Sequence, residues 1–582
     1  MIQDATKTYN NQEHRLADFD TLVDALEYAA RGTTGCNFYD AKGRLKTVLT
    51  YEELRNQAQT AAKRLTRLGL QRGDRVALVA DTSPDFMVLF FACRYAGLVP
   101  FAMPVSLNIG SHNIYVQQLK GLLKGGSASV AIAPQEFFSF LKEAATDLDQ
   151  IIWTGTPEML EAIPAEGELS SCEPDDVAYL QFTSGSTRFP QGVVITERAV
   201  MSNLQGIVRT GLAVRAGDRC ASWLPFYHDM GLVGFVLGPI VSQLSVDYLR
   251  TRDFAIRPLQ WLRLISNNAC TIAFSPPFGY ELCARRIREA DYAGLDLSSW
   301  RVAGVGAEMI RPSILENFGK KLSPAGFNAK AFLPCYGLAE ASLAASFSPL
   351  DKGLDVMSVD ALAMAEKGIV LRVKAEKRKT NEIVNCGRSL PGHSISIVND
   401  NGKPLPELRV GHVLISGPSL MSGYLNDPEA SVKIVSSGGQ LDTGDLGFMY
   451  KGDLYLTGRR KDVIIVNGRN IRAQDLEELA EDQPEVRMGD ASAFDVEDSQ
   501  GQQTVVLVVE CRLNDIAQRQ GLISRLQKLV YEGFGIRCLV ELVAPHTLPR
   551  TSSGKLSRVA ARKGFLERVD WNQATTSLAQ LG

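Results

Sequence analysis

The feature that most constrains this chain is a loop of hydroxyl and glycine residues between two short apolar stretches. Residues 177–182 and 193–196 are predicted strands, and the loop between them contains Thr183-Ser-Gly-Ser-Thr187. Backbone N–H groups of such a loop can surround the oxygens of a polyphosphate, and the hydroxyl of Thr187 could ligate Mg²⁺. The loop is not that of the P-loop NTPases, because no Gly-Lys-Ser/Thr follows. A hairpin turn at the surface is the alternative, since Ser, Thr and Gly favour turns.

The segments around this loop alternate between predicted helices and strands. Thr50 and Glu53 form a capping box for one helix, and Ser83 with Pro84 begins another. A short apolar strand, residues 75–80, lies between these two helices. This alternation predicts an α/β fold in which helices cover the faces of β-sheets.

The pattern changes near residue 460, after a dense run of charged side chains. Beyond the predicted strand 463–466 we expect helices near 475–480 and 522–534, and strands at 504–510 and 540–543. The roughly 120 residues in this part suffice for a small separate α/β domain. We therefore divide the chain into a large N-terminal domain, residues 1–460, and a small C-terminal domain, residues 461–582.

The composition is that of an ordinary globular protein. The 582 residues are 45 % hydrophobic and 22 % charged with a net charge of −3, so nothing indicates binding of nucleic acid. The ten cysteines form no CxxC pair and no HExxH occurs, which excludes the common zinc motifs and fits a reducing compartment. The N-terminus lacks the pattern of a signal peptide, and the longest uncharged stretch, residues 95–119, contains Pro100 and Pro104. We expect a cytoplasmic protein with no membrane span.

The loop, with Pro190 and Gly192 after it, resembles the signature TSGSTGxPKG of the adenylate-forming superfamily. This superfamily comprises acyl-CoA ligases, luciferases, peptide-synthetase adenylation domains and fatty acyl-AMP ligases. Arg188 replaces the third glycine and Gln191 replaces the lysine. An Arg at this place is similar to the fatty acyl-AMP ligase branch, and we hypothesise that it supplies the cation lost at Gln191. The resemblance implies that ATP phosphates contact Thr183, Ser184, Gly185, Ser186, Thr187 and Arg188.

Two further segments resemble the parts of this family that bind the acyl chain. The run from Ser222 to Gly234 implies that His228 lies near the reacting carboxylate and that an apolar tunnel is lined by Met230, Gly231, Leu232 and Val233. The second segment runs from Phe274 to Tyr280, and its Phe278 is expected in a second wall of the pocket. A packed turn with a satisfied histidine is the alternative for the first segment, and ordinary core packing is the alternative for the second.

Several more matches follow in the order of the family and imply the nucleotide site. The adenine side is expected at Gly306, Ala307, Glu308 and Gly337, with Tyr336 stacked on the base. Glu340 is expected to bind Mg²⁺, as is Thr187, and the ribose hydroxyls are expected to contact Asp445 and Arg459. Each short motif alone means little, because Gly-Ala-Glu or Tyr-Gly turns are common.

The last matches concern catalysis and domain movement. Lys461 occupies the hinge position of the family, and Lys555 lies in Pro549-Arg-Thr-Ser-Ser-Gly-Lys555, which resembles the final signature. A lysine between the attacking carboxylate and the α-phosphate would offset the repulsion between two anions. The resemblance thus makes Lys555, His228 and Glu340 the catalytic residues. It also implies ATP and Mg²⁺ as cofactors and a small C-terminal domain that moves.

The stretch 351–380, rich in charged residues, resembles the insertion of fatty acyl-AMP ligases, although a tolerated surface loop is the alternative. The branch implies that a medium- or long-chain fatty acid becomes acyl-AMP. The acyl group then passes to the phosphopantetheine arm of an acyl carrier protein or of a carrier domain in a polyketide or peptide synthase. A long-chain acyl-CoA ligase is the first competing hypothesis, and a non-catalytic acyl-binding scaffold, suggested by Gln191, is the second. An amino-acid activator is disfavoured by the residues around Tyr227.

Overall fold

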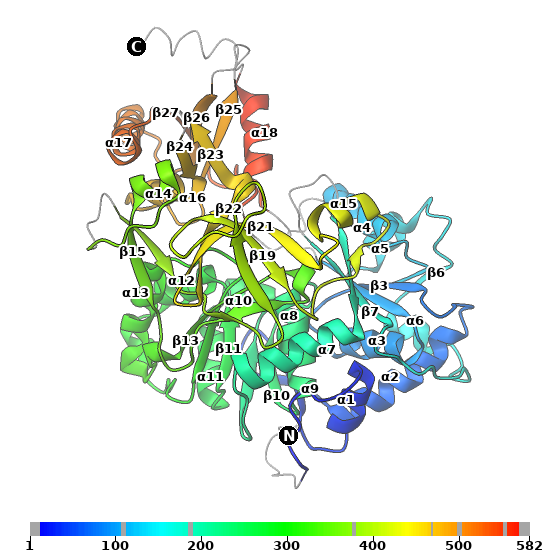
Figure 1. The fold of residues 1–582 in the computed structure, drawn as a ribbon. Helices are drawn as coiled ribbons and strands as arrows, with labels where there is room; N and C mark the ends of the chain where they lie inside the picture. Colours follow the sequence, from blue (N-terminus) through cyan, green and yellow to red (C-terminus); the bar gives the residue numbers. More distant parts are fainter. Residues whose placement is uncertain are drawn as a thin grey trace.

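The computed structural model describes residues 12–105, 112–183, 190–374, 380–466, 469–497, 503–550 and 556–569. Residues 184–188 of the predicted phosphate loop and Lys555 lie outside these ranges. Within the described residues, a large N-terminal domain built around three main sheets is followed by a small α/β domain that projects from one end (Figure 1). None of the helices in these ranges combines the length and the apolar character that crossing a bilayer requires.

The longest sheet runs through the middle of the N-terminal domain. Among the described residues it has nine strands, in the order β17-β14-β13-β12-β11-β9-β10-β1-β2. Its central strands are parallel and buried on both faces, which explains why they read as short continuous apolar runs. The strands are β1 Gly35–Tyr39, β2 Leu45–Thr50, β9 Arg219–Ser222, β10 Ser245–Leu249, β11 Ile272–Ser275, β12 Val302–Val305, β13 Phe332–Gly337, β14 Ala344–Phe347 and β17 Arg388–Ser389.

The second sheet carries the predicted phosphate loop. Its described strands follow the order β20-β8-β7-β4-β3-β5-β6, and β7 pairs antiparallel with β8 on either side of that loop. The predicted strands 75–80, 177–182 and 193–196 are therefore confirmed within one residue. The strands are β3 Arg75–Val79, β4 Val99–Met103, β5 Val130–Ile132, β6 Trp153–Gly155, β7 Val177–Phe182, β8 Gly192–Thr196 and β20 Gly423–Tyr424.

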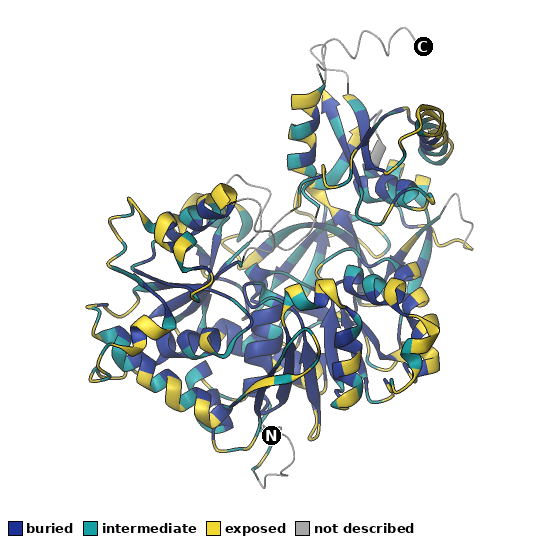
Figure 2. Ribbon diagram, turned by 180° about the vertical axis from the view of Figure 1, so that it is seen from behind, coloured by how far each residue is buried: buried dark blue, intermediate teal, exposed yellow. Residues whose placement is uncertain are grey.

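Helices cover both sheets, with their exposed residues facing outward (Figure 2). The predicted capping box is confirmed: Glu53 N donates to Thr50 Oγ1 at 3.1 Å, and Thr50 N donates to Glu53 Oε2 at 2.9 Å. The helices of the N-terminal domain are α1 Leu22–Ala29, α2 Tyr51–Thr66, α3 Pro84–Tyr95, α4 His112–Gly125, α5 Phe138–Ala145, α6 Pro157–Glu161, α7 Glu197–Gly206, α8 Asp229–Gly231, α9 Gly238–Val241, α10 Thr251–Ile256, α11 Leu259–Asn267, α12 Pro277–Arg286, α13 Pro312–Leu322, α14 Ala361–Lys367 and α15 Pro428–Ile434.

A third sheet leads toward the C-terminal domain. It consists of β18 Ser394–Val398, β19 Gly411–Ser416, β21 Gln440–Tyr450 and β22 Asp453–Arg459 in that order. The predicted insertion, residues 351–380, contains β15 Val356–Asp360 and α14, and β15 pairs antiparallel with β16 Thr380–Val384, which begins where the insertion ends. Met357, Val359 and Met364 of the insertion belong to a small apolar cluster that they share with Ile383 of β16 and with Phe448 and Tyr455 of β21 and β22.

The C-terminal domain has its own core, built on the sheet β25 Ala491–Glu497, β26 Gln503–Glu510 and β27 Cys538–Val543. Alternate residues of β26 face opposite sides: Val505, Leu507 and Val509 join one apolar cluster, and Val506 and Val508 join another. The helices α17 Ile516–Phe534 and α18 Arg558–Arg568 lie on opposite sides of this sheet (Figure 1). The remaining elements are β23 Val463–Val466, β24 Arg469–Arg472 and α16 Ala473–Glu481.

The prediction for α17 is wrong at its start, which lies at Ile516 rather than at residue 522. The buried apolar residues of the helix begin only at Leu522, because residues 516–521 are exposed or, at Arg519, half-buried. Their start signal is Asp515, whose Oδ1 accepts a hydrogen bond from Gln518 N at 2.7 Å.

Candidate active site

A cavity of about 1140 Å³ lies where the large sheets meet the C-terminal domain. Most of the predicted site residues that the structure describes line it: Thr183, His228, Met230, Phe278, Ala307, Glu308, Tyr336, Gly337, Glu340, Asp445, Arg459 and Lys461. Gly231, Leu232 and Gly306 do not line it, and neither does Val233. Residues 184–188 and Lys555 lie outside the described residues, although Pro549, Arg550 and Leu556, which flank the Lys555 segment, belong to the lining.

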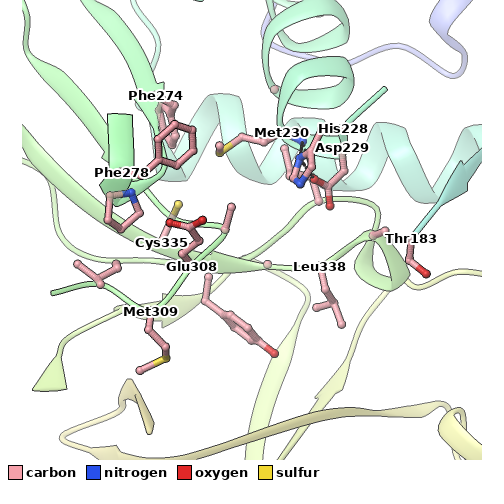
Figure 3. Close-up of a pocket in the computed structure, with 18 of the residues that line it drawn as sticks. Thr183, His228, Asp229, Met230, Phe274, Phe278, Glu308, Met309, Cys335 and Leu338 are labelled. Carbon is pink, nitrogen blue, oxygen red and sulfur yellow. Dashed lines mark hydrogen bonds and ion pairs between the residues drawn. The ribbon is translucent and has the colours of Figure 1, made fainter. Parts of the chain in front are cut away.

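One end of the cavity is apolar. Met230, Phe274 and Phe278 surround it in Figure 3, and Phe274 packs edge to face on Phe235 with ring centroids 5.8 Å apart. The sequence analysis placed Gly231 in this wall, but a side chain there would collide with the carbonyl oxygen of Pro225 at 2.0 Å. Gly231 thus allows the chain to turn tightly, and Met230 before it and Gly234 and Phe235 after it belong to the wall.

Two short π-helices form much of this apolar end. η1 Ile207–Gly211 contributes Ile207 and Val208, and η2 Leu232–Leu237 contributes Gly234 and Phe235. A π-helical turn widens the helix and often occurs at functional sites. The sequence analysis missed these four residues, because a single π-turn leaves no periodicity that distinguishes it from an α-helix.

His228 stands between the apolar end and the polar end. It is the N-cap of α8, and its Nδ1 lies 2.6 Å from Asp229 Oδ1, as Figure 3 shows. Asp229 Oδ1 also accepts a hydrogen bond from Met230 N at 2.7 Å. The imidazole is therefore held by its neighbour at Nδ1, which fixes the orientation of the ring at the cavity wall.

The polar end brings together the residues predicted for ribose and adenine. Tyr336 at the end of β13 donates its hydroxyl to Asp445 Oδ2 at 2.6 Å, and Arg459 Nε lies 3.2 Å from Asp445 Oδ1. The register of β21 with β22 places Asp445 directly opposite Arg459. Burial raises the pKa of Asp445, while Arg459, Tyr336 and Lys461 oppose that rise. The arrangement presents an aromatic ring beside a carboxylate that can accept from a vicinal diol.

Glu340 is held by a residue that the sequence analysis did not identify. Tyr424 on β20 donates its hydroxyl to Glu340 Oε1 at 2.8 Å. Burial raises the pKa of Glu340, and the hydrogen bond from Tyr424 opposes that rise. The two residues lie 84 positions apart, so no local spacing could have signalled the contact.

Gln191, at the position of the family's loop lysine, closes the base of the phosphate loop. Its carbonyl oxygen accepts from Thr183 N at 3.1 Å, and its Nε2 donates to Asp427 Oδ2 at 3.2 Å. Asp427 is also the N-cap of α15, where its Oδ1 accepts from Ala430 N. The side chain of Gln191 therefore ties the loop to the segment that carries Tyr424.

The insertion reaches both the cavity and the C-terminal domain. Glu382 and Ile383 of β16 belong to the cavity lining, and Asn381 Nδ2 donates to Asp475 Oδ2 on α16 at 3.3 Å. Within the insertion, α14 lies beside β24 of the C-terminal domain. The insertion thus contacts the small domain in this conformation.

Comparisons with known proteins agree with these features. The AMP-binding enzyme family matches residues 35–425. A putative acyl-CoA synthetase of Caulobacter vibrioides is 42% identical over 96% of this chain and 98% of its own length. The medium-chain-fatty-acid–[acyl-carrier-protein] ligase JamA of Moorena producens is 32% identical over 94% of this chain and 96% of its own. A solved structure from a study of fatty acyl-adenylate ligases from E. coli and L. pneumophila has a TM-score of 0.91 and 47% identity, covering 97% of this chain and 100% of that one.

The chain therefore belongs to the AMP-binding enzyme family, and the predicted fold class of adenylate-forming enzymes is confirmed. It is an ATP-dependent enzyme that forms acyl-adenylates, as the motif resemblance predicted. The division into 1–460 and 461–582 and the roles of the single site residues stay predictions.

Proposed function

We propose that the enzyme activates a medium- or long-chain fatty acid with ATP and then transfers the acyl group to the phosphopantetheine arm of a carrier protein or carrier domain. The observation that carries this proposal is one continuous cavity with two unlike ends. An apolar wall of Met230, Phe274 and Phe278 fits a hydrocarbon chain, and the cluster of Tyr336, Asp445 and Arg459 fits a nucleoside.

The first step joins the two ends of the cavity. A carboxylate oxygen of the fatty acid attacks the α-phosphorus, the new O–P bond forms, and the bond to the β-phosphate oxygen breaks to release pyrophosphate. Lys555 bridges the carboxylate and the α-phosphate, and His228 orients the carboxylate from the wall. The protein forms no covalent intermediate in this step. Its contribution to the rate is therefore to hold the two anions in position and to stabilise the developing charge.

Glu340 fits the role of the protein carboxylate that would hold Mg²⁺. Mg²⁺ in phosphoryl-transfer sites uses one or two carboxylates together with phosphate oxygens and water, rather than a cage of protein ligands. The described residues contain no group of three or more His, Cys, Asp or Glu arranged around one metal position. When bound, Mg²⁺ screens the charge of the phosphates.

Two of the relatives support a carrier protein as the acceptor. JamA and TtuA of Teredinibacter turnerae are both named medium-chain-fatty-acid–[acyl-carrier-protein] ligases, and TtuA is 33% identical over 71% of this chain and 67% of its own length. The insertion adds a physical argument, since α14 within it lies beside β24 of the small domain, and Asn381 directly after it donates to Asp475, so that both contacts would restrain that domain. Coenzyme A is the second candidate acceptor, because the Caulobacter relative is a putative acyl-CoA synthetase.

The test combines laurate, ATP and Mg²⁺ with coenzyme A, with a phosphopantetheinylated carrier protein, or with neither, and measures products by mass spectrometry. We expect lauroyl-AMP without an acceptor and acyl-carrier protein with the carrier. Substantial lauroyl-CoA would instead support the coenzyme A ligase. Laurate-dependent ATP–pyrophosphate exchange that disappears in Lys555→Ala excludes the non-catalytic scaffold. Arg188→Gly should weaken ATP use, and unchanged turnover would refute its compensation for Gln191.

A further inference from the structure

We propose that Arg558 is a positioning residue that locks the segment bearing Lys555 to the linker between the two domains. The inference rests on the proposed function, because it assumes that Lys555 acts in adenylation. Arg558 is the first residue of α18 and lines the cavity beside Asp462 and Glu477.

The guanidinium of Arg558 joins three elements of the chain. Its Nε and Nη2 donate to the two carboxylate oxygens of Glu477 on α16 at 2.7 and 2.6 Å, and its Nη1 donates to Asp462 Oδ2 at 2.7 Å. Asp462 ends the short turn Arg460–Asp462, which follows β22 of the large domain directly. Glu477 is 4 % exposed and is fixed in turn by Ala493 N, which donates to its Oε1 at 3.0 Å.

The base of the segment that contains Lys555 is closed on both sides. Ser557 N donates to Pro549 O at 2.9 Å, and Arg550 and Leu556 form an isolated antiparallel bridge. Arg550 Nη2 also donates to Gly489 O at 2.6 Å. The two ends of the segment that contains Lys555, at Arg550 and at Leu556, therefore lie side by side. Arg558 is two positions after Leu556 and three positions after Lys555.

This arrangement needs arginine and not only a positive charge. A guanidinium can donate in a plane to both oxygens of one carboxylate and still reach a second carboxylate, whereas an ammonium on a flexible stem cannot hold that geometry. The fork makes the linker residue Asp462 and the base of the Lys555 segment parts of one rigid unit. A rotation at Lys461 would then move Asp462, Glu477 and Arg558 together.

A misplacement of about 1 Å at a reacting group can lower the rate about 100-fold. We therefore expect Arg558→Lys to lower kcat of laurate-dependent ATP–pyrophosphate exchange about 10- to 100-fold, with the KM for ATP within about twofold of the wild type. Transfer from chemically prepared lauroyl-AMP to carrier protein should be unchanged, because Lys555 is outside the site in that step. The matched control is Arg562→Lys, one turn later on α18, where Arg562 Nε donates to the backbone oxygen of Asp495 at 2.9 Å rather than to a carboxylate.

Asp462→Asn serves as the second variant, because it removes the charge from one arm of the fork and leaves Glu477 paired with Arg558. We expect it to keep the thermal stability of the wild type and to lose less kcat than Arg558→Lys. The double variant should lose no more than Arg558→Lys alone, since both changes break the same link.

Equal kcat for Arg558→Lys and Arg562→Lys would overturn the proposal. The proposal would also be overturned if Arg558→Lys or Asp462→Asn lowered the rates of adenylation and of transfer to carrier protein equally. An equal fall of both rates would indicate a general destabilisation of the protein. If the wild-type enzyme made no lauroyl-AMP, the proposed function itself would be refuted. This outcome is seen before any variant is made and is therefore distinct from a failure of the inference about Arg558.

Discussion

Glu481 offers the sharpest test of the electrostatics between the two domains. It is the last residue of α16, its Oε1 accepts from Gly489 N at 2.7 Å, and its Oε2 accepts from Arg311 Nη1 of the large domain. Arg311 also reaches Glu478, with Nε 2.9 Å from its Oε1. Burial raises the pKa of Glu481 from 4.5 to about 7, Arg311 opposes the rise, and nearby Glu477 adds to it.

The consequence for stability follows from the sign of this change. Between pH 4.5 and about 7 the folded protein keeps the proton that the unfolded chain has released, so stability falls as the pH rises through that window. At about 1.36 kcal/mol for each pKa unit, the whole window corresponds to about 3 kcal/mol. Roughly 2 kcal/mol of this falls between pH 5 and pH 8. Glu481→Gln removes the titrating group and therefore this part of the pH dependence.

The assay is thermal unfolding of the wild type and of Glu481→Gln by calorimetry at pH 5 and pH 8. The Tm of the variant minus the Tm of the wild type should rise by about 8 °C between pH 5 and pH 8. This figure takes about 4 °C per kcal/mol for a domain as small as the C-terminal one. A difference that stays constant or falls would refute the reasoning from burial. Glu485→Gln is the matched control: the pKa of this half-buried carboxyl is lowered by the hydrogen bond from Arg525, so its variant should gain nothing at pH 8.

Two further predictions concern the nucleotide end and the backbone near it. Tyr336→Phe removes the hydroxyl that holds Asp445. The KM for ATP should then rise about 5- to 20-fold, because the loss of a hydrogen bond to a charged group costs about 1–2 kcal/mol. An unchanged KM would contradict the role of this pair. Gly387→Ala places a Cβ 1.7 Å from the carbonyl oxygen of Phe347 at a φ of +76°, so it should destabilise the protein by about 3 kcal/mol or more in urea unfolding. Gly402→Ala, with a φ of +73° and open space, should cost only about 1 kcal/mol, and equal losses would show that φ alone decides.

Local signals in the sequence were sufficient for those parts of the fold that depend on neighbours along the chain. The capping box at Thr50 can be predicted from Thr50 and the residue three positions later. The strand β26 can be predicted from its own run of Val and Leu. The start of α17 at Ile516 was missed because its first turns face water and carry no apolar repeat. The roles of residues 184–188 of the phosphate loop and of Lys555 stay predictions from the sequence, since these residues lie outside the described ranges.

The parts of the site that could not be predicted are long-range pairs. Tyr424 and Glu340 are 84 positions apart, and Arg558 and Glu477 are 81 positions apart. Neither pair has a spacing that a sequence could reveal, because the distance between them is set by how the sheets and domains pack. The same holds for Gln191, which departs from the family motif and acquires its role only through Asp427 on another element.

These pairs also explain how a cavity lined by so many acidic side chains can accept a polyphosphate anion. Asp445, Glu340 and Glu477 line the cavity, and burial alone would make each an obstacle to ATP. Each one is engaged by a donor from a distant part of the chain: a phenol holds Asp445, a second phenol holds Glu340, and the guanidinium of residue 558 holds Glu477. Their negative charge is thus tied to fixed donors before the nucleotide arrives, which makes the site preorganised. Arg459 and Lys461 line the same cavity and set the local sign of the field, so that loss of the phenol at Tyr336 or at Tyr424 should weaken nucleotide binding even where the acid itself remains.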